Sequence, residues 1–80
     1  MRATVLVRPK QGILDPQGEA VEGSLRKLGF QVGAIRVGRV IDVELEAGDP
    51  DVARAEVERM CSELLANPLI ESVEIRLEER

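Results

Sequence analysis

The chain of 80 residues carries a net charge of −4, and its one aromatic residue is Phe30. An acidic chain without Tyr or Trp lacks the positive charge and the stacking surface on which nucleic acid binding depends, so we expect no nucleic acid partner. No apolar run approaches the roughly 18 residues that a membrane helix needs, so we also expect no membrane partner.

The first predicted element is a strand over Ala3–Arg8, a run of mostly β-branched and apolar residues. Both faces of this strand are largely apolar, which favours the centre of a sheet over its edge. Pro9 follows, and the strand should end there because proline cannot donate a ladder hydrogen bond.

A loop and a helix follow the strand. Residues 9–18 hold two prolines and two glycines and show no apolar period, which predicts a loop. Asp15 and Pro16 stand in the order of an N-cap and a first helical residue. The helix should cover residues 16–28, because apolar residues recur there at i, i+4 and i+7, in Val21, Leu25 and Leu28.

The stretch 31–46 allows two interpretations. Apolar residues stand at odd positions and charged residues at even ones, and this alternation continues across Gly38: Ile35, Val37, Ile41, Val43 and Leu45 against Arg36, Asp42, Glu44 and Glu46. A two-residue turn at Gly38 would set an apolar face against a polar one and is disfavoured. A three-residue turn over residues 38–40 and one long strand bent at Gly38 both keep the apolar residues on one side, and we favour the bent strand.

A second helix and a last strand complete the chain. Asp49 and Pro50 repeat the helix start, and Asn67 and Pro68 end the helix. Its buried stripe is predicted to consist of Ala53, Val57, Met60, Cys61 and Leu64. From residue 69 to 77 apolar and polar residues alternate at Val73, Ile75 and Leu77, as in a half-exposed strand.

These elements predict an α+β fold, a two-layer sandwich of a largely antiparallel sheet with two helices on one face. It is related to the ferredoxin-like fold if residues 38–40 form a turn. We expect residues 1–80 to form one domain. Such a domain buries only roughly 60% of the surface of its unfolded chain, and an aliphatic core is thin, so a homodimer or a larger homo-oligomer is expected.

The sequence offers little chemistry for catalysis. It has no histidine, the commonest general base, and its seven glycines form no phosphate-binding motif. Cys61, on an apolar stripe, is interpreted as a core residue and not as a nucleophile. The alternating carboxylates of residues 42–46 are typical of the exposed side of a strand and not of a metal site. We therefore expect no catalytic residue, metal or cofactor in this chain, and the single cysteine predicts a cytoplasmic protein.

The candidate functional residues lie in the loop Lys10–Gly18 and around Gly38. The loop carries two apolar residues where polar groups are usual, and four cations flank the end of the first strand and Gly38. The four cations are also compatible with an ordinary solvated edge of the sheet. With the apolar loop they form one candidate partner-docking surface, made of Arg8, Lys10, Ile13, Leu14, Asp15, Arg36, Gly38 and Arg39.

Five blocks of the sequence, taken in order, resemble the PurS family. They are VRPK at 7–10, GILDPQG at 12–18, LGF at 28–30, IRVGR at 35–39 and LLANPLIE at 64–71. The chain departs from the family pattern at Arg39, where lysine is common, and at Val40 and near Val73, where aromatic residues are common.

The resemblance implies a non-catalytic assembly subunit of phosphoribosylformylglycinamidine (FGAM) synthase, an enzyme of purine (IMP) biosynthesis that uses ATP and glutamine. It implies that a glutaminase subunit releases ammonia and that a large synthetase subunit, with ATP and magnesium, activates the amide of formylglycinamide ribonucleotide. A PurS-like dimer would bring these two subunits together so that ammonia is not lost. The alternative is an ACT-like regulatory module, which is also a small dimeric βα sandwich and binds amino acids between its subunits.

Overall fold

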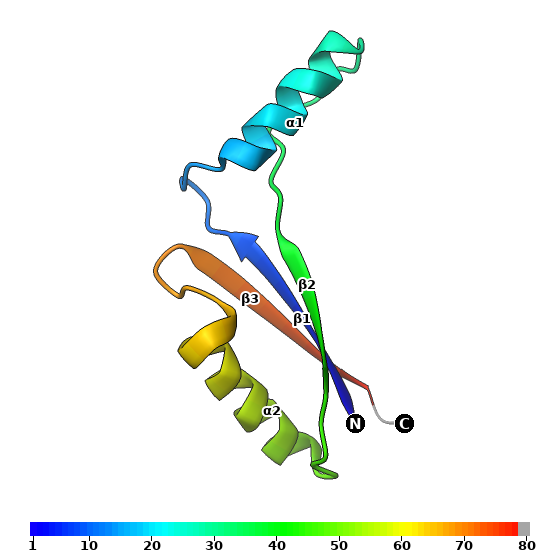
Figure 1. Ribbon diagram of the computed structural model, residues 1–80, viewed down its shortest axis with the longest axis vertical. Helices are drawn as coiled ribbons and strands as arrows, with labels where there is room; N and C mark the ends of the chain where they lie inside the picture. The colour runs from blue at the N-terminus through cyan, green and yellow to red at the C-terminus, as the bar shows by residue number, and fades with distance from the viewer. Residues whose placement is uncertain (79–80) are drawn as a thin grey trace.

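The computed structural model describes residues 1–78, in which three strands and two helices alternate along the chain (Figure 1). The predicted domain limit at residue 80 lies outside the described residues. β1 (Arg2–Pro9) is the central strand and pairs antiparallel with β2 (Arg39–Glu44) on one side and with β3 (Glu71–Glu78) on the other. The predicted central position of the first strand is therefore confirmed.

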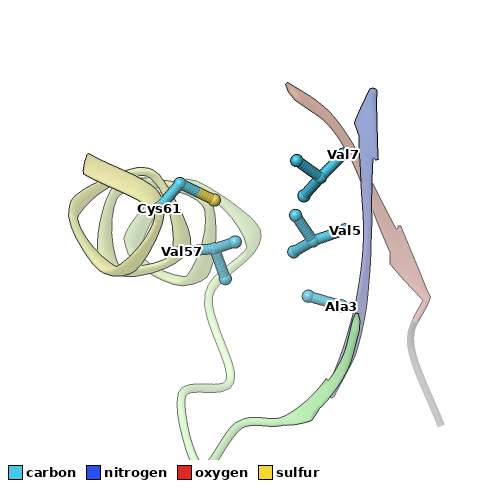
Figure 2. Close-up of a cluster of buried hydrophobic side chains, with 5 residues drawn as sticks. All are labelled: Ala3, Val5, Val7, Val57 and Cys61. Atoms are coloured by element: carbon cyan, nitrogen blue, oxygen red, sulfur yellow. The ribbon is translucent and has the colours of Figure 1, made fainter. Parts of the chain in front are cut away.

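One face of the sheet carries the core. Ala3, Val5 and Val7 of β1 are buried there and face Val57 and Cys61 (Figure 2), and the five side chains form one cluster. These two side chains are presented by α2 (Pro50–Met60) and by η1 (Cys61–Leu65), the π-helical turn that continues it. Cys61 is 7% exposed, so its interpretation as a core residue is confirmed. The core is small because its members are short side chains.

The last turn of the second helix differs from the prediction. In η1 the amide of Ala66 donates to the carbonyl oxygen of Cys61, five residues back, at 3.1 Å. This wider turn leaves Leu64 outside the stripe, with 84% of its surface exposed, and Leu65 packs against the core instead. The predicted burial of Leu64 is wrong because it assumed an α-helical period to the end of the helix.

α1 (Pro16–Lys27) does not lie on the sheet but projects as an arm beyond the ends of β1 and β2 (Figure 1). The described chain measures 49 × 27 × 14 Å, and its radius of gyration is 15.8 Å. A compact chain of this length would have a radius of about 12 Å. The α+β class with an antiparallel sheet and two helices is confirmed, but only α2 covers the predicted face. The apolar stripe of α1 indicated that another surface covers this helix, but it could not indicate whether that surface is the sheet.

Residues 31–38 return from the arm to the sheet without a turn at Gly38, and ladder pairing begins at Arg39. Residues 38–40 therefore do not form the three-residue turn of a hairpin. The extended course through Gly38 is closer to the single bent strand, the interpretation that we favour. A Cβ atom at Gly38 would overlap the carbonyl oxygen of Val7, so this close approach requires glycine. Across residues 1–78, no helix has the length and apolarity that crossing a membrane requires.

Candidate docking surface

The eight residues predicted to bind partners lie at one end of the sheet, where β1 ends and β2 and β3 begin, or in the two segments that join the sheet to α1. The register brings the strand ends together, because Val7 pairs with Arg39 and Pro9 pairs with Glu71. Seven of the residues line two hollows or form two internal ties, and Leu14 lies in the loop beside the second hollow.

The first hollow lies over the start of β2 and has a volume of about 250 Å³. Its lining combines apolar and basic side chains, namely Leu6, Val7, Arg8, Arg36, Gly38, Arg39 and Val40. Arg8 forms an ion pair with Glu74 at 3.6 Å, and Arg36 donates to the carbonyl oxygen of Pro9. Val40 is 62% exposed, so this hollow offers an apolar side chain beside cations.

The second hollow lies between the loop after β1 and the segment that returns from α1, and its volume is also about 250 Å³. Ile13, Asp15 and Arg36 of the predicted set line it. Arg36 lines both hollows, so the two lie next to each other. Leu14 lies in the same loop and is 73% exposed, as the docking interpretation requires.

Arg39 forms an internal tie. Its Nη1 lies 2.7 Å from Oε2 of Glu71, its Nη2 donates to Oε1 of the same carboxylate at 3.2 Å, and Nη2 also donates to the carbonyl oxygen of Leu65. The amide of Asn67 donates to Glu71 as well, at 2.7 Å. The hydrogen bond from Arg39, followed by that from Asn67, lowers the pKa of Glu71, and Glu71 in turn raises the pKa of Arg39. This guanidinium is therefore committed to joining β2 to the turn before β3.

Lys10 forms the second tie, between the end of β1 and the segment before β3. Its Nζ donates to the carbonyl oxygen of Pro68 at 2.7 Å, and its amide donates to that of Ile70 at 2.8 Å. This tie places Leu69, which is 82% exposed, close to the end of β1.

Sequence reasoning missed three residues of this region: Leu64, Leu69 and Glu71. Leu64 was assigned to the core, and Leu69 was assigned to a strand that begins two residues later. For Leu69 a signal was available in the helix stop at Asn67 and Pro68, because a residue that directly follows such a stop is expected to lie in a turn.

Burial, and secondarily the negative charge of Glu58, raises the pKa of the Cys61 thiol, which favours the unreactive protonated form. Over residues 1–78, no group of three or more His, Cys, Asp or Glu side chains is placed to hold a metal ion.

Comparisons with known proteins identify relatives over the whole length of the chain. The PurS family model, described as phosphoribosylformylglycinamidine (FGAM) synthase, matches residues 2–79. The PurS subunit of FGAM synthase from Methanocaldococcus jannaschii is 38% identical over 98% of this chain and 95% of its own length. The corresponding subunit from Archaeoglobus fulgidus is 40% identical over 94% of this chain and 95% of its own length.

Solved structures agree with these relatives. Crystalline PurS from Methanocaldococcus jannaschii, a subunit of formylglycinamide ribonucleotide amidotransferase in the purine biosynthetic pathway, superposes with a TM-score of 0.87 at 38% identity, covering 99% of this chain and 96% of that one. A chain in the structure of PurLQS from Thermotoga maritima superposes with a TM-score of 0.85 at 36% identity, covering 94% of this chain and 93% of that one. These matches do not favour the ACT-like alternative. This chain belongs to the PurS family of FGAM synthase subunits.

Proposed function

We propose that this chain is the non-catalytic subunit that joins the glutaminase and the synthetase of FGAM synthase in purine biosynthesis. The observation that carries the proposal is the likeness to a chain of the PurLQS structure. In the proposed complex the glutaminase releases ammonia from glutamine, and the synthetase uses ATP and magnesium to activate the amide of formylglycinamide ribonucleotide. Because free ammonia would escape into water, a subunit that holds the two active sites together raises the yield of FGAM.

The end of the sheet described above suits such docking. Three leucines near that end are largely exposed: Leu14 in the loop after β1 at 73%, Leu64 in η1 at 84% and Leu69 in the turn before β3 at 82%. Arg8 and Arg36 line the first hollow at the same end of the sheet and would favour partners with acidic surfaces. We assign the docking role to this leucine-rich end and expect Arg39 to support it through the fold.

We further propose that the subunit is a homodimer. Val21 and Leu28 of the apolar stripe of α1 are exposed, and among residues 1–78 the outer edge of β2 has no neighbouring strand. The side chains of Ile41, Val43 and Leu45 are only partly buried beside α2. A second copy could cover this face with its own arm and accept the first arm in return, which is the self-complementary contact of a twofold dimer. The free thiol of Cys61 suits a reducing compartment such as the cytoplasm.

The test is reconstitution with the glutaminase and synthetase subunits in the presence of glutamine, magnesium and ADP, followed by a turnover assay with ATP. The wild-type chain should co-purify with both partners. Leu14→Asp should weaken association roughly 30-fold, the loss expected when a central apolar anchor worth about 2 kcal/mol is removed. Glutamine-dependent turnover should then fall at limiting partner concentration and recover in part at high concentration, whereas turnover with added ammonia should be nearly unchanged.

Gln17→Asp is the matched control, because it adds the same charge at an exposed residue close to the same loop without removing an apolar side chain. It should affect glutamine-dependent turnover much less than Leu14→Asp. Full turnover by a folded Leu14→Asp variant at limiting concentration would contradict the assignment of this loop to docking, and failure of the wild-type chain to co-purify would contradict the bridging function.

A further inference from the structure

The α1 arm is joined to the sheet by two chain segments, residues 10–15 on the way out and residues 35–38 on the way back. We call these two segments the neck. A single carboxylate links them. Oδ1 of Asp15 accepts a hydrogen bond from the amide of Gly18 at 3.0 Å, and its Oδ2 accepts one from the amide of Val37, 22 residues away, at 2.8 Å.

Asp49 shows what an N-cap without this second contact looks like in the same chain. It also precedes a proline at the start of a helix, and its carboxylate accepts from the amide of Asp51, two residues further on, at 2.9 Å. That bond lies within the turn that begins α2. Capping a helix therefore does not require the reach that Asp15 has, and the bond to Val37 needs a separate explanation.

The neck is closely packed where Asp15 and Gly18 meet Ile35. Gly18 is buried, and a Cβ atom there would overlap the carbonyl oxygen of Ile35 and lie 2.6 Å from Oδ2 of Asp15. Arg36 ties the returning segment to the carbonyl oxygen of Pro9. The two segments therefore cannot slide past each other unless these contacts break.

The state of Asp15 agrees with this geometry. Its pKa is lowered first by the hydrogen bond from Gly18, then by that from Val37, and to a smaller extent by the positive charge of Arg36. Glu19, in the first turn of α1, is the other carboxylate that lines the same hollow. The ionised carboxylate accepts one amide on each of its two oxygens, whereas asparagine, of nearly the same size, has only one acceptor oxygen.

We propose that Asp15 is a positioning residue that acts as a clasp and fixes the direction of α1 relative to the sheet. A flexible neck would let the arm sample many directions, and ordering it on association would cost conformational entropy. With the clasp closed, the apolar stripe of α1 is held in one direction before it meets a second copy of the chain. The contacts of the neck are sufficient to support a fixed direction of α1. The effect of that direction on association rests in addition on the proposed homodimer.

Asp15→Asn is the sharp probe. Asparagine is an N-cap as good as aspartate, so the hydrogen bond from Gly18 can persist. Its amide nitrogen, however, is a donor and cannot accept from Val37. Asp49→Asn is the matched control, because it makes the same chemical change at the local cap of α2.

The direction of the arm can be measured by double electron–electron resonance between spin labels at Ser24→Cys in α1 and Ser72→Cys in β3, in a Cys61→Ala background. Both labelled positions are exposed. Dilution with excess unlabelled chain restricts the signal to distances within one chain. The wild-type chain and Asp49→Asn should give one narrow distance distribution, whereas Asp15→Asn should at least double its width. The amide of Val37 should also exchange its hydrogen about tenfold faster in Asp15→Asn.

Asp15→Ser provides a second test, because its hydroxyl can cap α1 but is too short to reach Val37, and it should broaden the distribution equally. A distribution as narrow in Asp15→Asn and Asp15→Ser as in the wild type would overturn the proposal. Equal broadening in Asp49→Asn would also overturn it, because the cause would then be the loss of any cap. A monomeric wild-type chain with a narrow distribution that broadens in Asp15→Asn would contradict the proposed dimer and leave the clasp standing.

Discussion

Arg39 and Glu71 stand 32 positions apart and meet across the end of β1. Arg39 pairs with Val7 and therefore lies on the face that α2 covers, from which its guanidinium reaches both the carboxylate of Glu71 and a carbonyl oxygen at the end of η1. The sequence shows a charge of each sign but not this pairing. Charge reversal at Arg39 would place two carboxylates together and damage the fold, so Leu14 is the better probe of docking.

Glu71 gives the structure a predictable response to acid. Its pKa is lowered in the folded chain below its ordinary value of 4.5, and that of Asp15 is lowered below 3.8. A carboxyl whose pKa is lower when folded contributes stability that is fully present above its unfolded pKa and is lost as the pH falls through its folded pKa. The midpoint temperature of unfolding should therefore be constant from pH 7 to about 5 and should fall below about pH 4.5.

Glu71→Gln should lower this midpoint at pH 7 and make its decline below pH 4.5 shallower, as thermal denaturation followed by circular dichroism would reveal. Glu56→Gln, at an exposed position of α2, is the control and should follow the wild-type profile. An acid response of Glu71→Gln as steep as that of the wild type would mean that the ion pair with Arg39 does not contribute to stability.

At the scale of elements, the sequence predicted the helix starts and the central strand, which depend on residues close together in the chain. Both helices begin at an Asp-Pro pair, as expected, because the aspartate caps the first turn and the missing amide of proline costs nothing there. The central strand was recognisable from its two apolar faces. The π-helical turn was not, because it depends on how the end of the helix meets the segment before β3 and not on the residues of the turn alone.

The register of this turn can be tested with a matched pair of leucines. Leu65→Ala should lower the free energy of unfolding by about 1 to 2 kcal/mol, because its half-buried side chain packs against the core. Leu64→Ala should change it by no more than about 0.5 kcal/mol, because Leu64 is 84% exposed. Urea denaturation measures both. Equal losses, or a larger loss at Leu64, would restore the α-helical period to the end of the helix and contradict η1.

At the scale of the whole molecule, the sequence predicted that α1 exists but not where the helix lies relative to the sheet. Its stripe, its start and its end were all predicted, yet the helix stands away from the sheet (Figure 1). The contacts that decide its direction, between Asp15 and Val37 and between Gly18 and Ile35, join residues about 20 positions apart and have no local pattern. The candidate docking residues were predicted as a set because they lie near strand ends, whereas their division into hollows and internal ties follows from side-chain geometry.

The arm also permits a test of the dimer that leaves the core of each copy intact. Val21→Asp places a charge in the stripe of α1, where Val21 is 39% exposed, and α1 contributes no side chain to the cluster beneath α2. The variant should therefore keep its sheet and α2, as amide exchange in β1 would report.

If the stripe is covered by a second copy, burying an unpaired carboxylate there should weaken dimerisation by a factor of roughly 30 or more, which sedimentation over a range of concentrations measures. Ala20→Asp adds the same charge at the neighbouring exposed residue, whose side chain points about 100° away from that of Val21 around the helix, and it should leave the dimer unchanged. A monomeric wild-type chain at micromolar concentration, or a Val21→Asp variant that dimerises as tightly as Ala20→Asp, would show that the stripe of α1 does not serve self-association.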